Sequence, residues 1–284
     1  MSLKNKLHNL LSSLVNEAPK QVFLSLSNVS YGDILRDKVV LVVGGSKGIG
    51  YTIAKRAVQE GAKVIVTGRS EHSLKEAVAS IGNNASYIEY DNENIQARES
   101  FLDECSSIYG DIDCFVLNAG ISFHEGNFSN VSVEGFEKQL KINLESTYFL
   151  IQAVIKRHTN NSRKINILVT SSETSAKYND LPYGISKVAI NSMIGGIARR
   201  VCQKGIRING IAPGVTLTDM TSDKTNTDDL YYNSALGRYI LPDEVANVAL
   251  FLLSDASSCV NGEIMFCDGG NHLKINGFDN NYNI

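Results

Sequence analysis

The sequence has few of the residues that mark a disulfide-stabilised or metal-binding protein. Its five cysteines are an odd number without a Cys-x-x-Cys pair, and its five histidines form no His-Glu-x-x-His pattern. Paired cysteines stabilise small secreted domains, and closely spaced Cys or His residues hold structural zinc. The sequence therefore predicts buried, reduced thiols and no metal site.

Long apolar runs and a strong excess of one charge are also missing. No stretch approaches the length of about 20 apolar residues that a membrane-spanning helix needs. The formal net charge at pH 7 is only -3, which gives no broad attraction to nucleic acid or to an anionic membrane. We expect a cytoplasmic protein that binds neither a membrane nor nucleic acid.

The sequence does have the size and composition of a globular protein with one large core, at 284 residues and 43% apolar. From residue 38 onward, short runs rich in Val and Ile alternate with longer stretches of helical periodicity, which is typical of βαβ units. Many of the short runs are apolar at nearly every position, as in a sheet covered on both faces. The seven expected strands are residues 39–43, 63–67, 86–90, 113–117, 165–170, 206–211 and 263–267.

The expected fold class is therefore α/β, a doubly wound, parallel, seven-stranded sheet with helices on both faces, as in Rossmann-like proteins. Ligands bind such sheets at the carboxyl ends of the strands. Residues 38–284 are expected to form the catalytic domain, with an asparagine-rich surface tail from residue 271.

Residues 1–37 form an extension outside this alternating pattern. A leucine stripe between residues 3 and 14 predicts an amphipathic helix that ends at Pro19, and residues 22–26 predict a short strand. The extension is expected to pack on the domain or on a neighbouring subunit. A cap over the mouth of the substrate site is the alternative.

A glycine-rich loop follows the first expected strand and precedes a helical stretch. It consists of Gly44, Gly45, Ser46, Lys47, Gly48, Ile49 and Gly50. Glycines allow close approach of the backbone to a ligand, and a helix N-terminus offers free N–H groups and partial positive charge to a pyrophosphate. No Gly-Lys-Ser/Thr ends the run, which excludes a Walker loop. The loop predicts a dinucleotide site.

The end of the second expected strand indicates which dinucleotide is bound. In dinucleotide folds an acidic residue about 20 positions past the loop accepts a hydrogen bond from the ribose 2′-hydroxyl of NAD. Here Gly68 stands at that place, followed by Arg69 and Ser70. Arg69 can bind a 2′-phosphate through its planar charged fork, and Lys47 adds a second positive group. NADP(H) is therefore the expected cofactor.

Tyr183 and Lys187 lie four positions apart at the start of a helical stretch, which places their side chains on one face. A cation about 4 Å from a phenol, at an effective dielectric near 20, favours the phenolate by roughly 4 kcal/mol. That energy would lower the phenol's pKa by about three. The pair therefore predicts a general acid that works near neutral pH.

With these residues the chain resembles the short-chain dehydrogenase/reductase family, in its single-domain branch, across about residues 38–270. Gly44, Gly48 and Gly50 are similar to the family's Thr-Gly-x-x-x-Gly-x-Gly loop, with Val43 in the threonine position. Residues 117–120 resemble its Asn-Asn-Ala-Gly, with a leucine replacing the first asparagine, and residues 267–270 resemble its terminal Asp-Gly-Gly segment.

The resemblance implies the rest of the active site. Asn143 is similar to an asparagine whose backbone holds a water connected to Lys187, and Ser172 to a serine that hydrogen-bonds the substrate carbonyl. The loop between Ser172 and Tyr183 is two residues shorter than is usual in the family, and Ser171 stays open as the alternative. The catalytic set is Asn143, Ser172, Tyr183 and Lys187. The expected cofactor contacts are Gly44, Gly45, Ser46, Lys47, Gly48, Ile49, Gly50, Arg69, Ser70, Asp91, Asn92, Asn118, Ala119, Gly120, Tyr183, Lys187, Pro213, Gly214, Val215, Thr216 and Thr218.

The activity implied is an NADPH-dependent carbonyl reductase, with hydride transfer between NADP(H) and a ketone or secondary alcohol. The substrate is expected to contact residues 121–131, the loop 173–182 and a lid at residues 215–242. A 3-oxoacyl thioester on acyl carrier protein is one candidate substrate. A basic area that could receive this acidic carrier comprises Lys156, Arg157, Arg163, Lys164, Arg199, Arg200 and Lys204.

Two alternatives stay open. One is a dehydrogenase of the same family for a sugar, a steroid or another small alcohol, and the other is a non-catalytic NADP-binding regulator. The resemblance also implies a homodimer or homotetramer that assembles through the helices bearing Asn143 and Tyr183.

Overall fold

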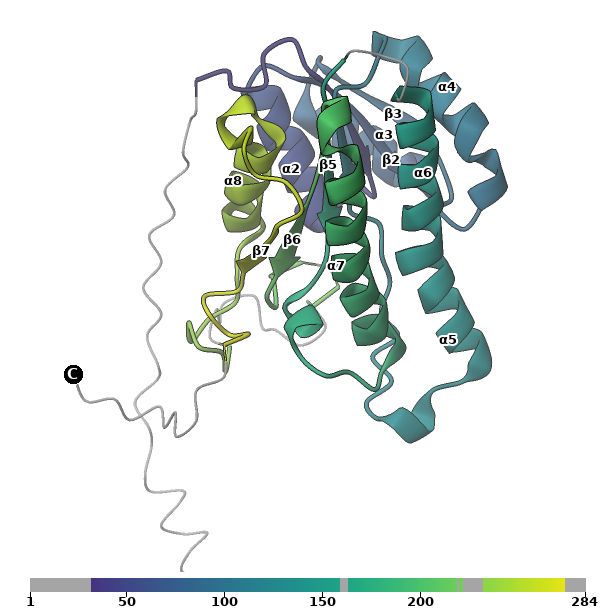
Figure 1. Ribbon diagram of the computed structural model, residues 1–284, viewed down its shortest axis with the longest axis vertical. Coiled ribbons are helices and arrows are strands. Elements are labelled where there is room, and N and C mark those ends of the chain that lie inside the picture. The colour runs from purple at the N-terminus through teal and green to yellow at the C-terminus, as the bar shows by residue number, and fades with distance from the viewer. Residues whose placement is uncertain (1–31, 159–162, 219, 222–231, 274–284) are drawn as a thin grey trace, which may run out of the picture.

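The computed structural model of the chain describes residues 32–158, 163–218, 220–221 and 232–273 (Figure 1). Seven parallel strands form one sheet in the order β3-β2-β1-β4-β5-β6-β7, which confirms the expected doubly wound topology. The strands are β1 (Val39–Val43), β2 (Lys63–Gly68), β3 (Ala85–Glu89), β4 (Cys114–Leu117), β5 (Ile165–Thr170), β6 (Ile206–Pro213) and β7 (Ile264–Cys267). Two of them have the predicted bounds, and the other five differ by one or two residues at their ends.

Helices cover both faces of this sheet. They are α2 (Gly48–Gln59), α3 (Glu71–Ile81), α4 (Arg98–Tyr109), α5 (Val133–Leu140), α6 (Ser146–His158), α7 (Pro182–Val201) and α8 (Pro242–Leu253). A π-helical turn, Lys141–Glu145, joins α5 to α6, so that the two run on as one long rod (Figure 1).

Alternate residues of the central strands pack on opposite helical layers. In β1, Val39, Leu41 and Val43 belong to a core cluster with residues of α4, α6 and α7. Val40 and Val42 belong to a second cluster with residues of α2, α3 and α8. All five residues of β1 are buried, which is why the strand is continuously apolar instead of alternating.

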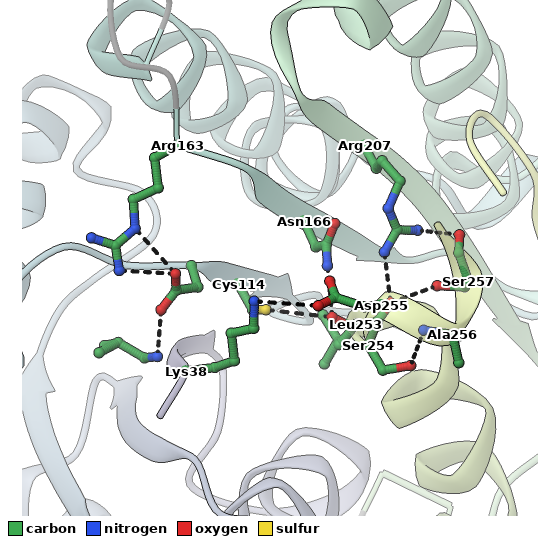
Figure 2. A network of polar contacts seen from close by, with 12 residues as sticks. Lys38, Cys114, Arg163, Asn166, Arg207, Leu253, Ser254, Asp255, Ala256 and Ser257 are labelled. Carbon is green, nitrogen blue, oxygen red and sulfur yellow. Dashed lines mark hydrogen bonds and ion pairs between the residues drawn. The ribbon is translucent and has the colours of Figure 1, made fainter. Parts of the chain in front are cut away.

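Polar side chains close the amino-terminal edge of the sheet, opposite the expected ligand site (Figure 2). The guanidinium of Arg207, at the start of β6, donates to four carbonyl oxygens at and beyond the C-terminal end of α8, including those of Ser254 and Ser257 at 2.9 Å each. The amide of Asn166 donates to the carbonyl oxygen of Leu253 at 2.6 Å. These bonds satisfy carbonyls that a helix end leaves without partners, so this edge is structural.

Part of the N-terminal extension packs on the domain. Leu35 is fully buried in the cluster that contains α2, and its backbone N–H donates to the carbonyl oxygen of Glu60 at 3.0 Å. The compact part of the chain therefore begins before residue 38. The helix and strand expected within residues 1–31, and the tail beyond residue 273, lie outside the described residues.

The cysteines differ from the expectation in part. All five are free thiols, but only Cys105 and Cys114 are buried, while Cys202 and Cys259 are exposed and Cys267 is intermediate. Burial raises the pKa of the Cys114 thiol to about 12, so this side chain behaves as a small apolar group. Among the described residues no group of three or more His, Cys, Asp or Glu side chains could hold a metal ion. No helix in this part of the chain is long and apolar enough to cross a membrane.

Candidate active site

The carboxyl ends of four neighbouring strands bring the expected site residues to one edge of the sheet. The chain leaves β1 at Gly44, β4 at Asn118, β5 at Ser171 and β6 at Gly214. These segments are up to 170 residues apart in the sequence (Gly44 to Gly214). The order of the strands, with β1 and β4 adjacent at the centre, places them side by side.

The glycine loop between β1 and α2 is tightly packed against the neighbouring segment. Gly44 has a φ of +78°, and a Cβ atom on it would lie 2.8 Å from the Cα atom of Ala119. A Cβ atom on Gly50 would lie 2.1 Å from the carbonyl oxygen of Gly44. No side chain caps the N-terminus of α2, whose first N–H groups face the loop. This uncapped helix end, reached by a glycine backbone, fits the pyrophosphate of a dinucleotide.

Asn118 ties three of these strand ends together. Its Nδ2 donates to the carbonyl oxygen of Gly44 at 2.9 Å, and its Oδ1 accepts from Oγ1 of Thr170 at 3.0 Å. The replacements at Val43 and Leu117 therefore leave the link between β1, β4 and β5 in place.

The segment after β2 carries the residues expected at the adenosine end. Arg69 is exposed, and a Cβ atom on Gly68 would lie 3.3 Å from Oγ of Ser46 in the glycine loop. No hydrogen bond or ion pair holds Arg69 among the residues that the structure describes. Its guanidinium is thus available beside the loop.

Three other expected cofactor contacts have side chains that already bond within the protein. Oγ of Ser70 accepts from the N–H of Ser73 at 3.3 Å as the N-cap of α3. One carboxylate oxygen of Asp91 accepts from the N–H of Glu93 at 3.0 Å. The amide of Asn92 donates to the carbonyl oxygen of Ile142 at 3.2 Å. Ser70 and Asn92 would therefore meet a cofactor mainly through their backbones.

Lys187 lies on the same helical face as Tyr183, and its ammonium donates to a backbone carbonyl oxygen. Nζ lies 5.5 Å from the centroid of the Tyr183 ring and donates to the carbonyl oxygen of Thr170 at 2.8 Å. Lys187 is 3% exposed, and this burial lowers its pKa to about 8. The helix thus brings the pair together as expected, with the amine directed at the end of β5.

The pKa of Tyr183 is raised, which corrects the expectation that Lys187 lowers it. Burial is the main cause, because water cannot solvate the phenolate there. A hydrogen bond with the side chain of Ser172 acts in the opposite direction, and the negative charge of Glu173 adds to the rise. In the absence of a ligand the phenol therefore keeps its proton at neutral pH.

The two candidate serines have different surroundings. Ser172 contacts Tyr183, and its Oγ also accepts from the N–H of Thr174 at 3.2 Å. Oγ of Ser171 instead donates to Oδ1 of Asn191, in the middle of α7, at 2.6 Å. Ser172 is the serine beside the phenol, whereas Ser171 fastens the end of β5 to the helix.

Asn143 lies in the π-helical turn and forms two hydrogen bonds with the chain after β4. Its Nδ2 donates to the carbonyl oxygen of Ile121 at 2.9 Å, and its Oδ1 accepts from the N–H of the same residue at 2.8 Å. A Cβ atom on Gly120 would lie 3.3 Å from this Oδ1 and 3.6 Å from Nζ of Lys187. Asn143 and Lys187 therefore meet at Gly120.

Comparison with known proteins agrees with this arrangement. A family model described as Enoyl-(Acyl carrier protein) reductase matches residues 43–272. L-rhamnose 1-dehydrogenase (NADP(+)) of Thermoplasma acidophilum is 31% identical over 250 residues, which cover 84% of this chain and 98% of that protein. The 3alpha-hydroxysteroid dehydrogenase of Mediterraneibacter gnavus is also 31% identical over 250 residues, covering 83% and 97%.

A solved structure is similar over the same part of the chain. The 3-ketoacyl-(acyl-carrier-protein) reductase from Brucella melitensis, complexed with NADH, superposes with a TM-score of 0.77 at 25% identity, covering 84% of this chain and 100% of that one. The chain belongs to the short-chain dehydrogenase/reductase family. Members of this family use a nicotinamide cofactor, which agrees with the cradle formed by the glycine loop.

In this short-chain dehydrogenase/reductase the segment after β6 lies against the glycine loop. A Cβ atom on Gly48 would lie 3.4 Å from the methyl carbon of Thr218, and Oγ1 of Thr216 donates to the carbonyl oxygen of Gly214 at 2.8 Å. Much of the expected lid, residues 219 and 222–231, lies outside the described residues. At its described end, the rings of Tyr232 and Tyr239 pack with centroids 4.8 Å apart.

The basic area expected to receive an acidic carrier protein is smaller than its sequence suggests. Arg157 is paired with Glu99 and Asp103, and Arg163 with Asp111 and Asp113, so acidic neighbours offset both charges. Two of the seven positive charges in this area are therefore offset. The sequence could not reveal this, because the carboxylates that pair with each arginine lie 50 or more residues away.

Glu173, the residue directly after Ser172, was expected only as part of the substrate loop 173–182. It is buried, although it is charged and opens the loop expected to contact the substrate. A carboxylate directly after the serine expected to be catalytic was the available signal.

Proposed function

We propose that this protein is an NADP(H)-dependent oxidoreductase that interconverts a ketone and a secondary alcohol. The observation that carries the proposal is the meeting of Ser172, Tyr183 and Lys187 beside the glycine loop at one sheet edge. A phenol hydrogen-bonded to a serine, in a place that excludes water, suits proton transfer to a carbonyl oxygen.

Each residue of the site has its own role in carbonyl reduction. The bound dinucleotide supplies the hydride. Ser172 donates a hydrogen bond to the substrate oxygen and polarises it. Tyr183 transfers its phenolic proton to that oxygen as negative charge develops there, and the phenolate is then reprotonated from solvent.

The raised pKa of Tyr183 supports this direction of proton transfer, because the free protein holds the phenol in its protonated form. An alkoxide is a far stronger base than a phenolate, so the transfer remains favourable. Lys187 would bind the nicotinamide ribose, and Asn143 would hold the water that links the site to solvent.

The preference for NADP(H) rests on the end of β2. Arg69 is exposed beside the glycine loop, and Gly68 leaves no carboxylate to repel a 2′-phosphate. A planar guanidinium binds phosphate through two parallel hydrogen bonds. The name of the Thermoplasma relative includes NADP(+), whereas the Brucella structure contains NADH, so this chain's own residues carry the choice.

The substrate is a small carbonyl compound or alcohol, and a 3-oxoacyl thioester is one candidate. The three similar proteins above are named for a sugar, a steroid and an acyl-carrier thioester, which agrees with a common reaction and differing substrate loops.

A second copy of the chain is proposed to cover an apolar groove along α5, α6 and α7. The groove has a volume of about 790 Å³ and is lined by Phe136, Leu140, Leu144, Tyr148, Phe149 and Met193, among others. Phe136 and Tyr148 are 38% and 44% exposed, which is unusual for clustered aromatic side chains. A homodimer in sedimentation equilibrium that Tyr148→Glu converts to monomer would support this assembly.

Replacement of Tyr183 by Phe tests the function, because it keeps the ring and removes the proton. We expect NADPH oxidation on a panel of ketones to fall by at least about a hundredfold, while NADPH binding stays close to wild type. Wild-type turnover in the variant would contradict the mechanism. NADPH binding without turnover of any carbonyl by the wild-type protein would favour the regulator instead.

A further inference from the structure

The buried carboxylate of Glu173 has no part in the mechanism above. Glu173 is 7% exposed and opens the short helix Glu173–Ala176, for which Ser172 is the N-cap. Removing an ionised carboxylate from water is unfavourable unless donors surround it. The number of donors around Glu173 therefore indicates whether the protein alone satisfies it.

The protein supplies one close donor to this carboxylate. Oε2 accepts from Nδ2 of Asn271 at 2.7 Å. Nζ of Lys177 lies 4.0 Å from Oε1, which is beyond hydrogen-bond distance. No other donor within the described ranges makes a hydrogen bond with it. Because a carboxylate can accept about four hydrogen bonds, the described residues leave most of this capacity unused.

The carboxylate lies near several residues expected to surround the substrate. A Cβ atom on Gly214, which begins the segment after β6, would be 3.3 Å from Oε2. Burial is the largest cause of the raised pKa values of Tyr183 and Tyr232, and the negative charge of Glu173 adds to both. Glu173 is thus within electrostatic reach of the proton donor and of the described end of the lid.

The partner of Glu173 is itself held in place. Oδ1 of Asn271 accepts from the N–H of Ala235 at 3.2 Å, and the N–H of Asn271 donates to the carbonyl oxygen of Asp268 at 3.2 Å. Asn271 therefore joins the segment after β7 to the end of the lid, and its amide fixes one carboxylate oxygen. The other oxygen, Oε1, faces Lys177 at 4.0 Å and accepts no hydrogen bond from a described residue.

We propose that Glu173 selects neutral substrates that carry hydroxyl groups next to the reacting carbon, as polyhydroxy ketones and polyols do. This inference rests on the proposed function and names its substrate class. A hydroxyl group can donate to the open positions of the carboxylate. An acyl chain or a steroid ring would cover the carboxylate without donating, and an anionic substrate would be repelled.

Three ketones with the same four-carbon chain test the selection in the complete protein with NADPH. Erythrulose carries hydroxyl groups on both sides of the carbonyl, 2-butanone carries none, and acetoacetate carries a negative charge. We expect the wild-type kcat/KM to be at least about tenfold higher for erythrulose than for 2-butanone, and lowest for acetoacetate.

Glu173→Gln keeps the shape and an acceptor for Asn271 but removes the charge. We expect kcat/KM for erythrulose to fall by about tenfold to hundredfold, chiefly through KM, with 2-butanone unchanged and acetoacetate improved. Glu104→Gln, which makes the same change at an exposed position of α4, is the matched control and should leave the order of the three ketones as it is in the wild type. NADPH affinity should be the same in all variants.

Several outcomes would overturn the inference. A wild-type preference for 2-butanone or acetoacetate would do so, and so would an equal loss on all three ketones in Glu173→Gln, which would make the carboxylate purely structural. If that variant does not fold, the wild-type order decides. Turnover that depends on Tyr183 but shows no preference for erythrulose would contradict this inference alone. The absence of turnover on every ketone would contradict the proposed function as well.

Discussion

Lys187 keeps its amine in the protein interior, and this should destabilise the fold at neutral pH. Its pKa falls from 10.5 to about 8 because the ammonium is buried. Between these two pKa values, the Lys187 amine is protonated in the unfolded chain and neutral in the folded protein. The free energy of unfolding therefore rises with pH over this range. The burial costs about 3 kcal/mol at pH 7 and about 1 kcal/mol at pH 9.5.

Lys187→Met removes the charge and keeps a side chain of similar length. The variant also loses the hydrogen bond to the carbonyl oxygen of Thr170, which is worth about 1 kcal/mol. We therefore expect the variant to be more stable than the wild type by about 2 kcal/mol at pH 7. This advantage should shrink by about 2 kcal/mol between pH 7 and pH 9.5, because the wild type gains stability over that range.

Urea unfolding of the cofactor-free proteins, followed by circular dichroism at a fixed protein concentration, measures both differences. Lys204→Met, at an exposed position beyond the end of α7, controls for the loss of one lysine. A stability difference between Lys187→Met and wild type that is the same at both pH values would refute the reasoning. The amine would then be solvated in the folded protein.

Three further changes probe other parts of the molecule. Arg69→Gln should raise KM for NADPH by about tenfold and leave KM for NADH unchanged, as initial rates with each cofactor would reveal. Ser172→Ala should lower kcat by about a hundredfold, whereas Ser171→Ala should keep kcat; the reverse pattern would exchange their roles. Both variants should lose about 1 kcal/mol in unfolding, Ser172→Ala through the lost N-cap bond to Thr174 and Ser171→Ala through the lost bond to Asn191. Arg207→Met should lower the free energy of unfolding by about 2 to 4 kcal/mol, because the variant loses hydrogen bonds to four carbonyl oxygens. KM for the cofactor and KM for the substrate should not change, since these bonds lie at the opposite edge of the sheet from the site. A loss below about 0.5 kcal/mol would show that the bonds contribute little to stability.

The fold could be predicted because its signals are local. Each central strand is a short, continuously apolar run such as Val39–Val43, and each crossover helix has apolar residues on one face. The glycine loop was recognisable for the same reason, since its position between a strand and a helix is read from neighbouring residues. The i, i+4 spacing likewise placed Tyr183 and Lys187 on one face.

The charges at the site could not be predicted in the same way. The spacing of Tyr183 and Lys187 left open where the ammonium points, and the structure shows that it donates to the carbonyl oxygen of Thr170 at the end of β5. Burial then raised the pKa of Tyr183, where the pair alone suggested that it would fall.

The sequence by itself determined the order of strands and helices, the dinucleotide loop and the residue types available for chemistry, because hydrophobic periodicity and glycine spacing act over a few residues. Only the tertiary structure decided which serine meets the phenol, which arginines are neutralised and that Glu173 is buried beside Gly214. These outcomes depend on burial and on partners from distant segments. Both arise when parallel strands bring their carboxyl ends together.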